Sequence, residues 1–303
     1  MRQAARESRF SAYRNEWGDM AHVTAIASQK GGTGKTVVAA ALGTLLAIAG
    51  QRTLLVDLDQ QADLTAMCGH NANTLDYSIV DVLAPLNPVP AGTAVVTSVH
   101  GVPGLDLLPS DLRAAALEKQ IISEVGREHL VRRALRELQS SYDHVIIDCP
   151  PSLGDMTING LCASDEVIAP VSMEDKNAVQ GAVNLLDTIH KLREQDQPVM
   201  LKTLIRIKAD STRQAHRALA DLERLGLPVA KTDLRARADW NNAGVEGMPV
   251  VLWAHRTDAA RDARNLAAEL WPEIQFPYAS EIRKELKQRQ SATAVAEASR
   301  AAA

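Results

Sequence analysis

A glycine-rich segment between two apolar stretches is the feature that most limits how this chain can fold. Residues 28–39 read SQKGGTGKTVVA and follow the apolar run HVTAIA at residues 22–27. The glycines let backbone N–H groups turn toward one point, where they can hold phosphate oxygens. The helix expected from Thr36 adds the positive end of its dipole at the same point. A strand, a glycine loop and a helix in this order predict an α/β domain that binds a nucleotide.

The end of this segment matches a phosphate-binding loop. Gly34-Lys35-Thr36 fits the last three positions of GxxxxGK[ST], although Gln29 stands where the leading glycine would be. We expect the Lys35 ammonium to reach the β- and γ-phosphates and the Thr36 hydroxyl to bind Mg²⁺. The residues expected to bind the nucleotide are Gly31, Gly32, Thr33, Gly34, Lys35, Thr36 and Val37. The pattern does not require the second lysine of the segment, Lys30.

Apolar runs recur along the chain and alternate with helical patterns. The expected strands lie within residues 22–28, 53–59, 105–110, 144–152, 166–172 and 200–207. These runs are apolar throughout, which is typical of strands in a parallel sheet that helices cover on both faces. The predicted fold is therefore α/β, a P-loop NTPase with a mostly parallel, twisted sheet and helices on both faces. The segment PVVLW at residues 249–253 is interpreted as an edge element.

Aspartates stand at the ends of two of these predicted strands. Asp57 and Asp59 end the run LLVDLD, and Asp148 ends the run VIID. The carboxyl ends of parallel strands form the ligand-binding edge of such a sheet, and carboxylates bind Mg²⁺. Alternation along a strand would send Asp57 and Asp59 to opposite sides, unless the chain turns between them.

The sequence KGGTGKT resembles the deviant Walker A motif of the ParA/MinD ATPases, and the resemblance covers about residues 22–272. In that family the extra lysine, here Lys30, reaches the phosphates of the ATP bound by the other subunit of a dimer. The stretch LLVDLDQQADLT resembles the family's second acidic motif, commonly DxDPQGN, and VIIDCPP resembles Walker B. The chain departs from the acidic motif at Gln60, where the family has proline, and at Ala62-Asp63, where the family has Gly-Asn.

This resemblance implies a role for each residue type at the site. Asp59 would position or deprotonate the attacking water, and Asp57 would lie near the Mg²⁺ shell. The residues implied as catalytic are Lys30, Lys35 and Asp59. The residues implied as metal-binding are Thr36, Asp57 and Asp148, with ATP and Mg²⁺ as cofactors. No arginine or glutamine stands out as a built-in transition-state group, so slow hydrolysis that a partner accelerates is expected.

Two later segments, residues 159–189 and 235–251, resemble ParA-type partition ATPases. This branch implies a homodimer that forms on ATP binding, nonspecific binding to double-stranded DNA and a ParB-like partner that stimulates hydrolysis. It also implies a cytoplasmic, nucleoid-associated protein that segregates a chromosome or plasmid. A protein cluster positioned on the nucleoid would use the same cycle, and the sequence does not separate the two cargoes.

Residues 190–237 contain eleven basic and six acidic side chains, a local charge of +5 in a chain whose net charge is −4. Such a patch suits phosphate contacts, which give an affinity that depends on salt and not on sequence. Solvated helix faces are the other interpretation of the same charges. The residues expected to contact DNA are Arg206, Lys208, Arg213, Arg235 and Arg237.

Other function classes fit the sequence less well. The last residues, SEIRKELKQRQSATAVAEASRAAA, lack the bulky apolar face of a MinD-like membrane helix. The three cysteines (Cys68, Cys149 and Cys162) form no CxxC pair, which disfavours a disulfide framework, a zinc site and a nitrogenase-reductase-like iron–sulfur protein. We expect one ATPase domain at residues 22–272, a polar tail or short helix at residues 1–21, and a charged tail at residues 273–303.

Overall fold

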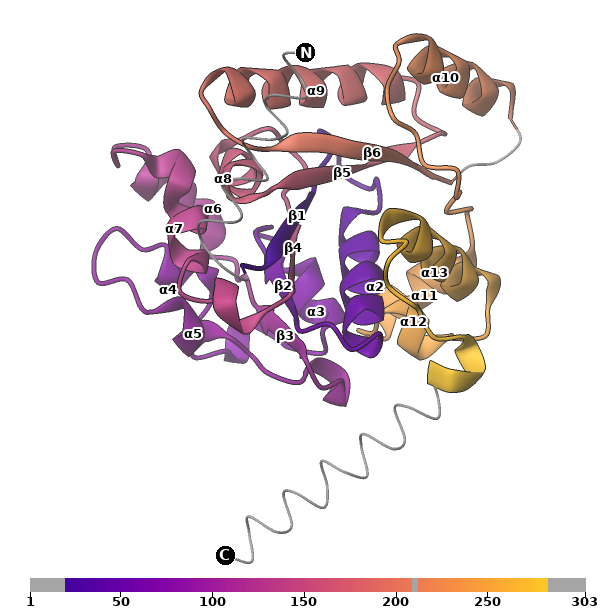
Figure 1. Ribbon diagram of the computed structural model, residues 1–303. Helices are drawn as coiled ribbons and strands as arrows, with labels where there is room; N and C mark the ends of the chain where they lie inside the picture. The colour runs from indigo at the N-terminus through magenta and orange to yellow at the C-terminus, as the bar shows by residue number, and fades with distance from the viewer. Residues whose placement is uncertain (1–19, 209–211, 283–303) are drawn as a thin grey trace, which may run out of the picture.

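A six-stranded sheet runs through the middle of the protein, with helices on both of its faces (Figure 1). The computed structural model describes residues 20–208 and 212–282. The strand order is β3-β2-β4-β1-β5-β6, and every pair of neighbouring strands is parallel. The strands are β1 His22–Ile26, β2 Thr53–Asp57, β3 Leu105–Leu108, β4 His144–Asp148, β5 Glu166–Ser172 and β6 Met200–Ile207. Each predicted run contains one of these strands, so the predicted fold class is confirmed.

The central strands are buried along their whole length, which explains why they read as continuous apolar runs. All five positions of β2 and all five of β4 are buried. Successive side chains of a strand point to opposite faces. Leu54 therefore packs in one apolar cluster, and Leu55 packs in a second cluster on the other face.

Two sets of helices cover these faces (Figure 1). The face of Leu55 is covered by α2 Lys35–Ile48, α3 Asp63–Met67, α11 Ala238–Val245, α12 Val250–Trp253 and α13 Asp258–Leu270. The face of Leu54 is covered by α4 Ile79–Val82, α5 Ala91–Ala94, α6 Ala114–Ile121, α7 Leu130–Leu135, α8 Asp155–Ala163, α9 Ala178–Glu194 and α10 Arg213–Arg224. Short 3₁₀ turns lie at η1 Ala72–Thr74, η2 Val99–Gly101, η3 Arg127–His129 and η4 Gln139–Ser141.

The structure differs from the sequence-based expectation near the C-terminus. The segment interpreted as an edge element forms the short helix α12, since Pro249 sets its first turn and Val250 and Val251 are buried against neighbouring helices. The packed chain also extends beyond residue 272, where we expected the domain to end, because Ile282 is only 2% exposed. Most of both predicted tails lies outside the described residues. None of the helices within residues 20–208 and 212–282 is both long and apolar enough to cross a membrane.

Candidate active site

The loop between β1 and α2 has the backbone that its glycines predict. Gly32 and Gly34 have φ values of +70° and +78°, a left-handed conformation that L side chains rarely adopt. The Thr33 side chain is turned inward, where its hydroxyl lies 2.5 Å from the Ser28 hydroxyl. Thr33 can therefore offer a ligand its backbone N–H, while its hydroxyl serves the loop itself.

The two lysines of the loop point in different directions. Lys35 is 6% exposed, and its Nζ donates a hydrogen bond of 3.3 Å to the backbone oxygen of Lys30. Its ammonium is thus folded over the loop. The Lys30 ammonium instead forms an ion pair of 2.7 Å with Asp175, in the loop after β5, and its side chain is 46% exposed. One loop therefore holds one cation inside its cradle and another outside it.

Asp57 and Asp148 lie side by side at the carboxyl ends of β2 and β4, and both are fully buried. Asp57 Oδ1 accepts a hydrogen bond of 3.0 Å from the Asp59 N–H, while its Oδ2 accepts one of 2.9 Å from the Thr65 N–H and one of 2.8 Å from the Thr65 hydroxyl. Burial raises the pKa of Asp57 to about 7, although these hydrogen bonds favour its ionised form.

Asp148 has no such donors. Neither of its carboxylate oxygens has a hydrogen-bond partner among the residues that the structure describes. Burial, and then the charge of Asp57, hold its pKa well above the ordinary value, while the Thr36 hydroxyl and the Lys35 ammonium favour the ionised form. The geometry thus leaves an unsatisfied carboxylate beside the start of α2.

Asp59 lies where the chain turns immediately after β2. Because its N–H donates to Asp57 and its Oδ1 accepts from the Gln61 N–H at 3.0 Å, the turn fixes its position. Its charge contributes to the raised pKa values of Asp57 and Asp148, so the three acids share one region. The structure brings together the loop, the aspartates and the start of α2 that we expected to form one site.

Comparison with known proteins agrees with this geometry. A family model described as an AAA domain matches residues 21–202. The chain is 32% identical over 254 residues to the sporulation initiation inhibitor protein Soj of Bacillus subtilis, covering 83% of this chain and 98% of Soj. It is 38% identical over 178 residues to the chromosome partitioning protein ParA of Caulobacter vibrioides, covering 58% of this chain and 65% of ParA. The chain belongs to the ParA/Soj family of P-loop ATPases.

Solved structures share the fold. Cobyrinic acid a,c-diamide synthase from Mycobacterium smegmatis, solved with ADP and magnesium, has a TM-score of 0.67 and 35% identity, covering 78% of this chain and 95% of that one. The cell division ATPase MinD of Pyrococcus furiosus has a TM-score of 0.71 over 84% of this chain and all of MinD, and at 20% identity it supports the fold alone. The first of these relatives was solved with a nucleotide and magnesium, which agrees with the ATP and Mg²⁺ expected from the sequence.

The residues present fit a magnesium ion. Mg²⁺ usually takes one or two protein carboxylates and completes its shell with water and phosphate oxygens. The unsatisfied oxygens of Asp148 beside Thr36 can supply such ligands, whereas both oxygens of Asp57 already accept hydrogen bonds. The described residues contain no group of three or more His, Cys, Asp or Glu that could hold a metal ion.

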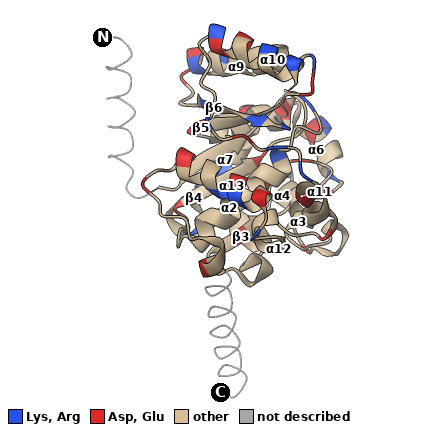
Figure 2. Ribbon diagram, turned by 90° about the vertical axis from the view of Figure 1, so that its right-hand side faces the viewer, with Lys and Arg blue, Asp and Glu red and all other residues tan. Residues whose placement is uncertain are grey.

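The structure separates the five expected DNA contacts into two groups. Arg206 pairs with Asp233 at 2.8 Å, Arg237 pairs with Asp258 and Asp262 at 3.1 and 3.3 Å, and Lys208 pairs with Glu174 at 3.4 Å. Arg213 and Arg235 are exposed, and no ion pair is found for either within the described ranges. Figure 2 shows that α9 and α10 carry both basic and acidic residues. The positive charge that remains unpaired in residues 190–237 is therefore smaller than the number of basic residues suggests.

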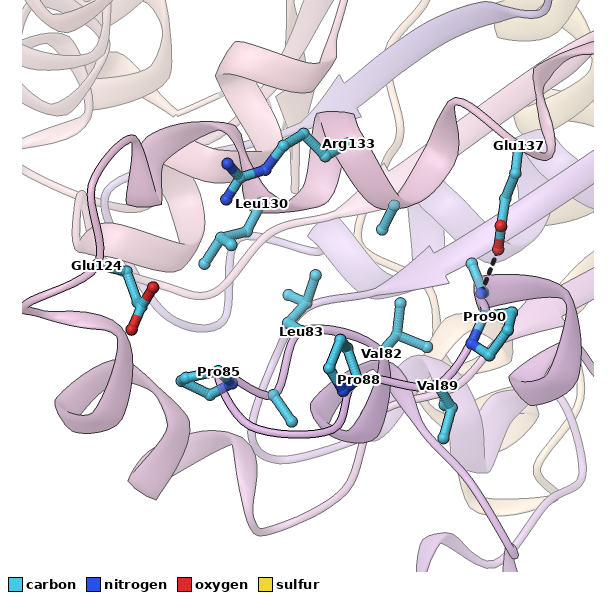
Figure 3. A pocket seen from close by; sticks show the side chains of 13 residues that line it. Val82, Leu83, Pro85, Pro88, Val89, Pro90, Glu124, Leu130, Arg133 and Glu137 are labelled. Carbon is cyan, nitrogen blue, oxygen red and sulfur yellow. Dashed lines mark hydrogen bonds between the residues drawn. The ribbon is translucent and has the colours of Figure 1, made fainter.

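A separate cavity of about 360 Å³ lies between α4, α5 and α7 (Figure 3). Most of its lining residues are apolar, Leu83, Pro85 and Leu130 among them, and Glu124, Arg133 and Glu137 add charged groups. The carboxylate of Glu137 on its wall accepts a hydrogen bond from the Ala91 N–H. The cavity shares no lining residue with the phosphate loop.

Sequence reasoning missed two residues that contact the site. Thr65 hydrogen-bonds Asp57, and Asp175 pairs with Lys30. Their contacts depend on how distant loops return to the edge of the sheet, and no spacing pattern within the single sequence marks them.

Proposed function

We propose that this chain is an ATPase that dimerises on ATP binding, binds DNA nonspecifically, and drives partition of a chromosome or plasmid with a ParB-like partner. The observation that carries the proposal is the position of Lys30. Its ammonium lies beside the phosphate loop but outside the cradle, and its side chain is 46% exposed. A cation in this position can meet the phosphates of a second subunit when two loops face each other.

Each step of the proposed cycle uses a residue of the site. The loop from Gly31 to Val37 binds ATP, Lys35 neutralises phosphate charge, and Thr36 and Asp148 hold Mg²⁺ with Asp57 nearby. Asp59 orients or deprotonates the attacking water. Two closed subunits form the DNA-binding state, and the partner accelerates hydrolysis, which releases the dimer. The protein would then be cytoplasmic and nucleoid-associated.

The proposed DNA surface centres on Arg213, Arg217 and Arg235. Arg213 and Arg217 are one helical turn apart on α10, so they share a face, and both are exposed. Gln214, between them, donates to the backbone oxygen of Glu174 in the loop after β5, which places the start of α10 near the edge of the sheet that carries the phosphate loop. Closure of a dimer at that edge would bring two such surfaces together.

Binding to a random-sequence duplex, measured with ATP, with ADP and without nucleotide across a salt series, tests the proposal. We expect tight binding only with ATP, with an affinity that falls steeply as salt rises. A triple variant, Arg213→Ala, Arg217→Ala and Arg235→Ala, should lower the salt slope by up to about 3 for each protomer bound, since each lost phosphate contact removes about 0.9. Arg136→Ala, an exposed arginine after α7, is the matched control and should bind normally. Equal binding in all nucleotide states, or by the triple variant, would contradict the proposal.

A further inference from the structure

Thr65 makes two hydrogen bonds to the same carboxylate oxygen of the site. Its N–H and its hydroxyl lie 2.9 and 2.8 Å from Asp57 Oδ2, and the Thr65 side chain is fully buried. The other oxygen of Asp57 accepts the N–H of Asp59 at 3.0 Å. Thr65 therefore fixes the carboxylate that in turn holds the turn carrying Asp59.

A second contact sets the direction of the Thr65 hydroxyl. The backbone N–H of Ser110, just after β3, donates to Thr65 Oγ1 at 3.0 Å. An amide N–H can only donate, so Thr65 Oγ1 acts as the acceptor in this bond and is left to point its own proton at Asp57. The loop after β3 thus determines how Thr65 holds the carboxylate.

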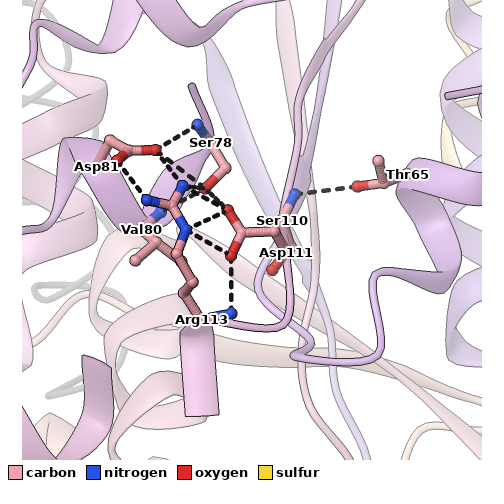
Figure 4. A network of polar contacts seen from close by, with 7 residues as sticks. All are labelled: Thr65, Ser78, Val80, Asp81, Ser110, Asp111 and Arg113. Carbon is pink, nitrogen blue, oxygen red and sulfur yellow. Dashed lines mark hydrogen bonds and ion pairs between the residues drawn. The ribbon is translucent and has the colours of Figure 1, made fainter. Parts of the chain in front are cut away.

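This loop is itself held by a network of charged groups (Figure 4). Arg113 pairs with Asp81 at 2.6 Å and with Asp111 at 2.7 Å, and the Ser78 hydroxyl donates to Asp111 at 2.5 Å. Burial opposes ionisation of Asp111, yet the bonds from Arg113 and Ser78 leave its pKa below the ordinary value. Ser110 precedes Asp111 directly, so the network anchors the N–H that contacts Thr65.

We propose that Thr65 is a positioning residue of the ATPase reaction, through which the loop after β3 fixes Asp57 beside Asp148, the carboxylate that would hold Mg²⁺, and fixes the turn that carries Asp59. The inference rests on the proposed roles of these three aspartates. Thr65 acts through Asp57, whose Oδ2 accepts the Thr65 N–H and hydroxyl. Groups outside the ligands that orient a metal site typically contribute 10- to 100-fold in metal affinity or activity.

Thr65→Val tests this role, because valine keeps the shape and the backbone N–H and removes only the hydroxyl. Binding of a fluorescent ADP analogue, measured with and without Mg²⁺, is the first readout. We expect normal affinity without Mg²⁺ and a loss of about ten-fold in the enhancement that Mg²⁺ gives, with kcat lowered about 10- to 100-fold and KM little changed. Thr65→Ser, which retains the hydroxyl, should restore both quantities.

Two results would overturn the proposal. One is a Thr65→Val protein with wild-type Mg²⁺ enhancement and kcat. The other is a loss of affinity that is the same with and without Mg²⁺ and that serine does not restore, which is the behaviour of a general structural defect. If Thr65→Val does not fold, Arg113→Met is the second test, because the Arg113 side chain is 56% exposed. An unchanged Mg²⁺ enhancement in the Arg113→Met protein refutes the proposal. A normal turnover rate in Asp59→Ala would remove the role of Asp59 alone, since Mg²⁺-dependent binding still tests Thr65.

Discussion

Gly43 lies where helix α2 packs most closely on the sheet, and an alanine there should destabilise the protein. A Cβ at this position would overlap Cδ2 of Leu55 and lie 3.2 Å from its Cγ, and Leu55 is fully buried on β2. Leu55 must leave its rotamer or α2 must move away from the sheet. Overpacking of this kind costs about 1–3 kcal/mol. Alanine recovers about 1 kcal/mol of helix propensity, which leaves a net destabilisation of up to about 2 kcal/mol.

Gly181→Ala is the matched control. Gly181 is also inside a helix, α9, but a Cβ there would meet nothing within 4 Å. The helix-propensity gain is then not opposed, and Gly181→Ala should stabilise the protein by about 0.5–1 kcal/mol. The same chemical change should therefore have opposite signs at the two sites, with a difference of about 1–3 kcal/mol between the variants.

Urea and thermal unfolding without nucleotide measure this difference. For a domain of this size each kcal/mol moves Tm by about 2 °C, so Gly43→Ala should melt up to about 4 °C below wild type and Gly181→Ala slightly above it. Gly43→Ala should also weaken ATP binding, because α2 carries Lys35 and Thr36 at its first turn. Equal stabilisation by both alanines would show that the contact with Leu55 does not limit the packing of α2.

Two further predictions concern acid stability and dimerisation. Burial, and then the charge of His22, lower the pKa of His144 to about 4. Burial alone would raise the pKa of Glu166, but hydrogen bonds and charges from His22 and Lys202 hold it at about 2. Both values lie below the ordinary ones, so the unfolded chain binds more protons at these two groups on acidification. The stability that His144 contributes should fall between about pH 6.5 and 4 and that of Glu166 between about pH 4.5 and 2, while the raised pKa of Asp57 acts in the opposite direction. The urea midpoint of wild type should therefore fall relative to that of His144→Phe as the pH is lowered through the first window, and a constant difference would exclude His144. Lys30→Ala should keep ATP binding and lose ATP-dependent dimerisation in sedimentation, and a Lys30→Ala protein that dimerises normally would refute the role in trans. Asp175→Asn should strengthen dimerisation by up to about five-fold for each of the two Lys30–Asp175 pairs in a homodimer, since an exposed ion pair contributes no more than about 1 kcal/mol.

The sheet was predictable from the sequence largely because its central strands are buried on both faces. A strand with no solvent-exposed face reads as an unbroken apolar run, and all of the predicted runs contain strands. The sequence was less informative where tertiary packing decides. The run PVVLW is rich in β-branched residues, yet Val250 and Val251 bury their side chains in a helix against α2 and α13.

The site was predictable in its backbone and less so in its side-chain partners. Positive φ at Gly32 and Gly34 follows from residue type. The turn between Asp57 and Asp59 was left open by strand alternation and depends on a hydrogen bond between the two residues. Counting basic residues overstated the free charge, because the acids that neutralise Arg237 come from α13, some twenty residues further along the chain.

The two lysines of the phosphate loop differ because of their places relative to its glycines. Lys35 follows the last left-handed glycine and begins α2, so its side chain can fold back over the loop, where the Lys30 carbonyl accepts its hydrogen bond. Lys30 precedes the glycines, and its side chain extends to the loop after β5. A cation inside the loop would serve a nucleotide bound there. A cation outside it, held only by an exposed ion pair, costs little to redirect, since such pairs contribute about 0–1 kcal/mol. A second set of phosphates, brought close by another subunit, offers Lys30 more negative charge than Asp175 does, and this difference would make ATP binding favour the dimer.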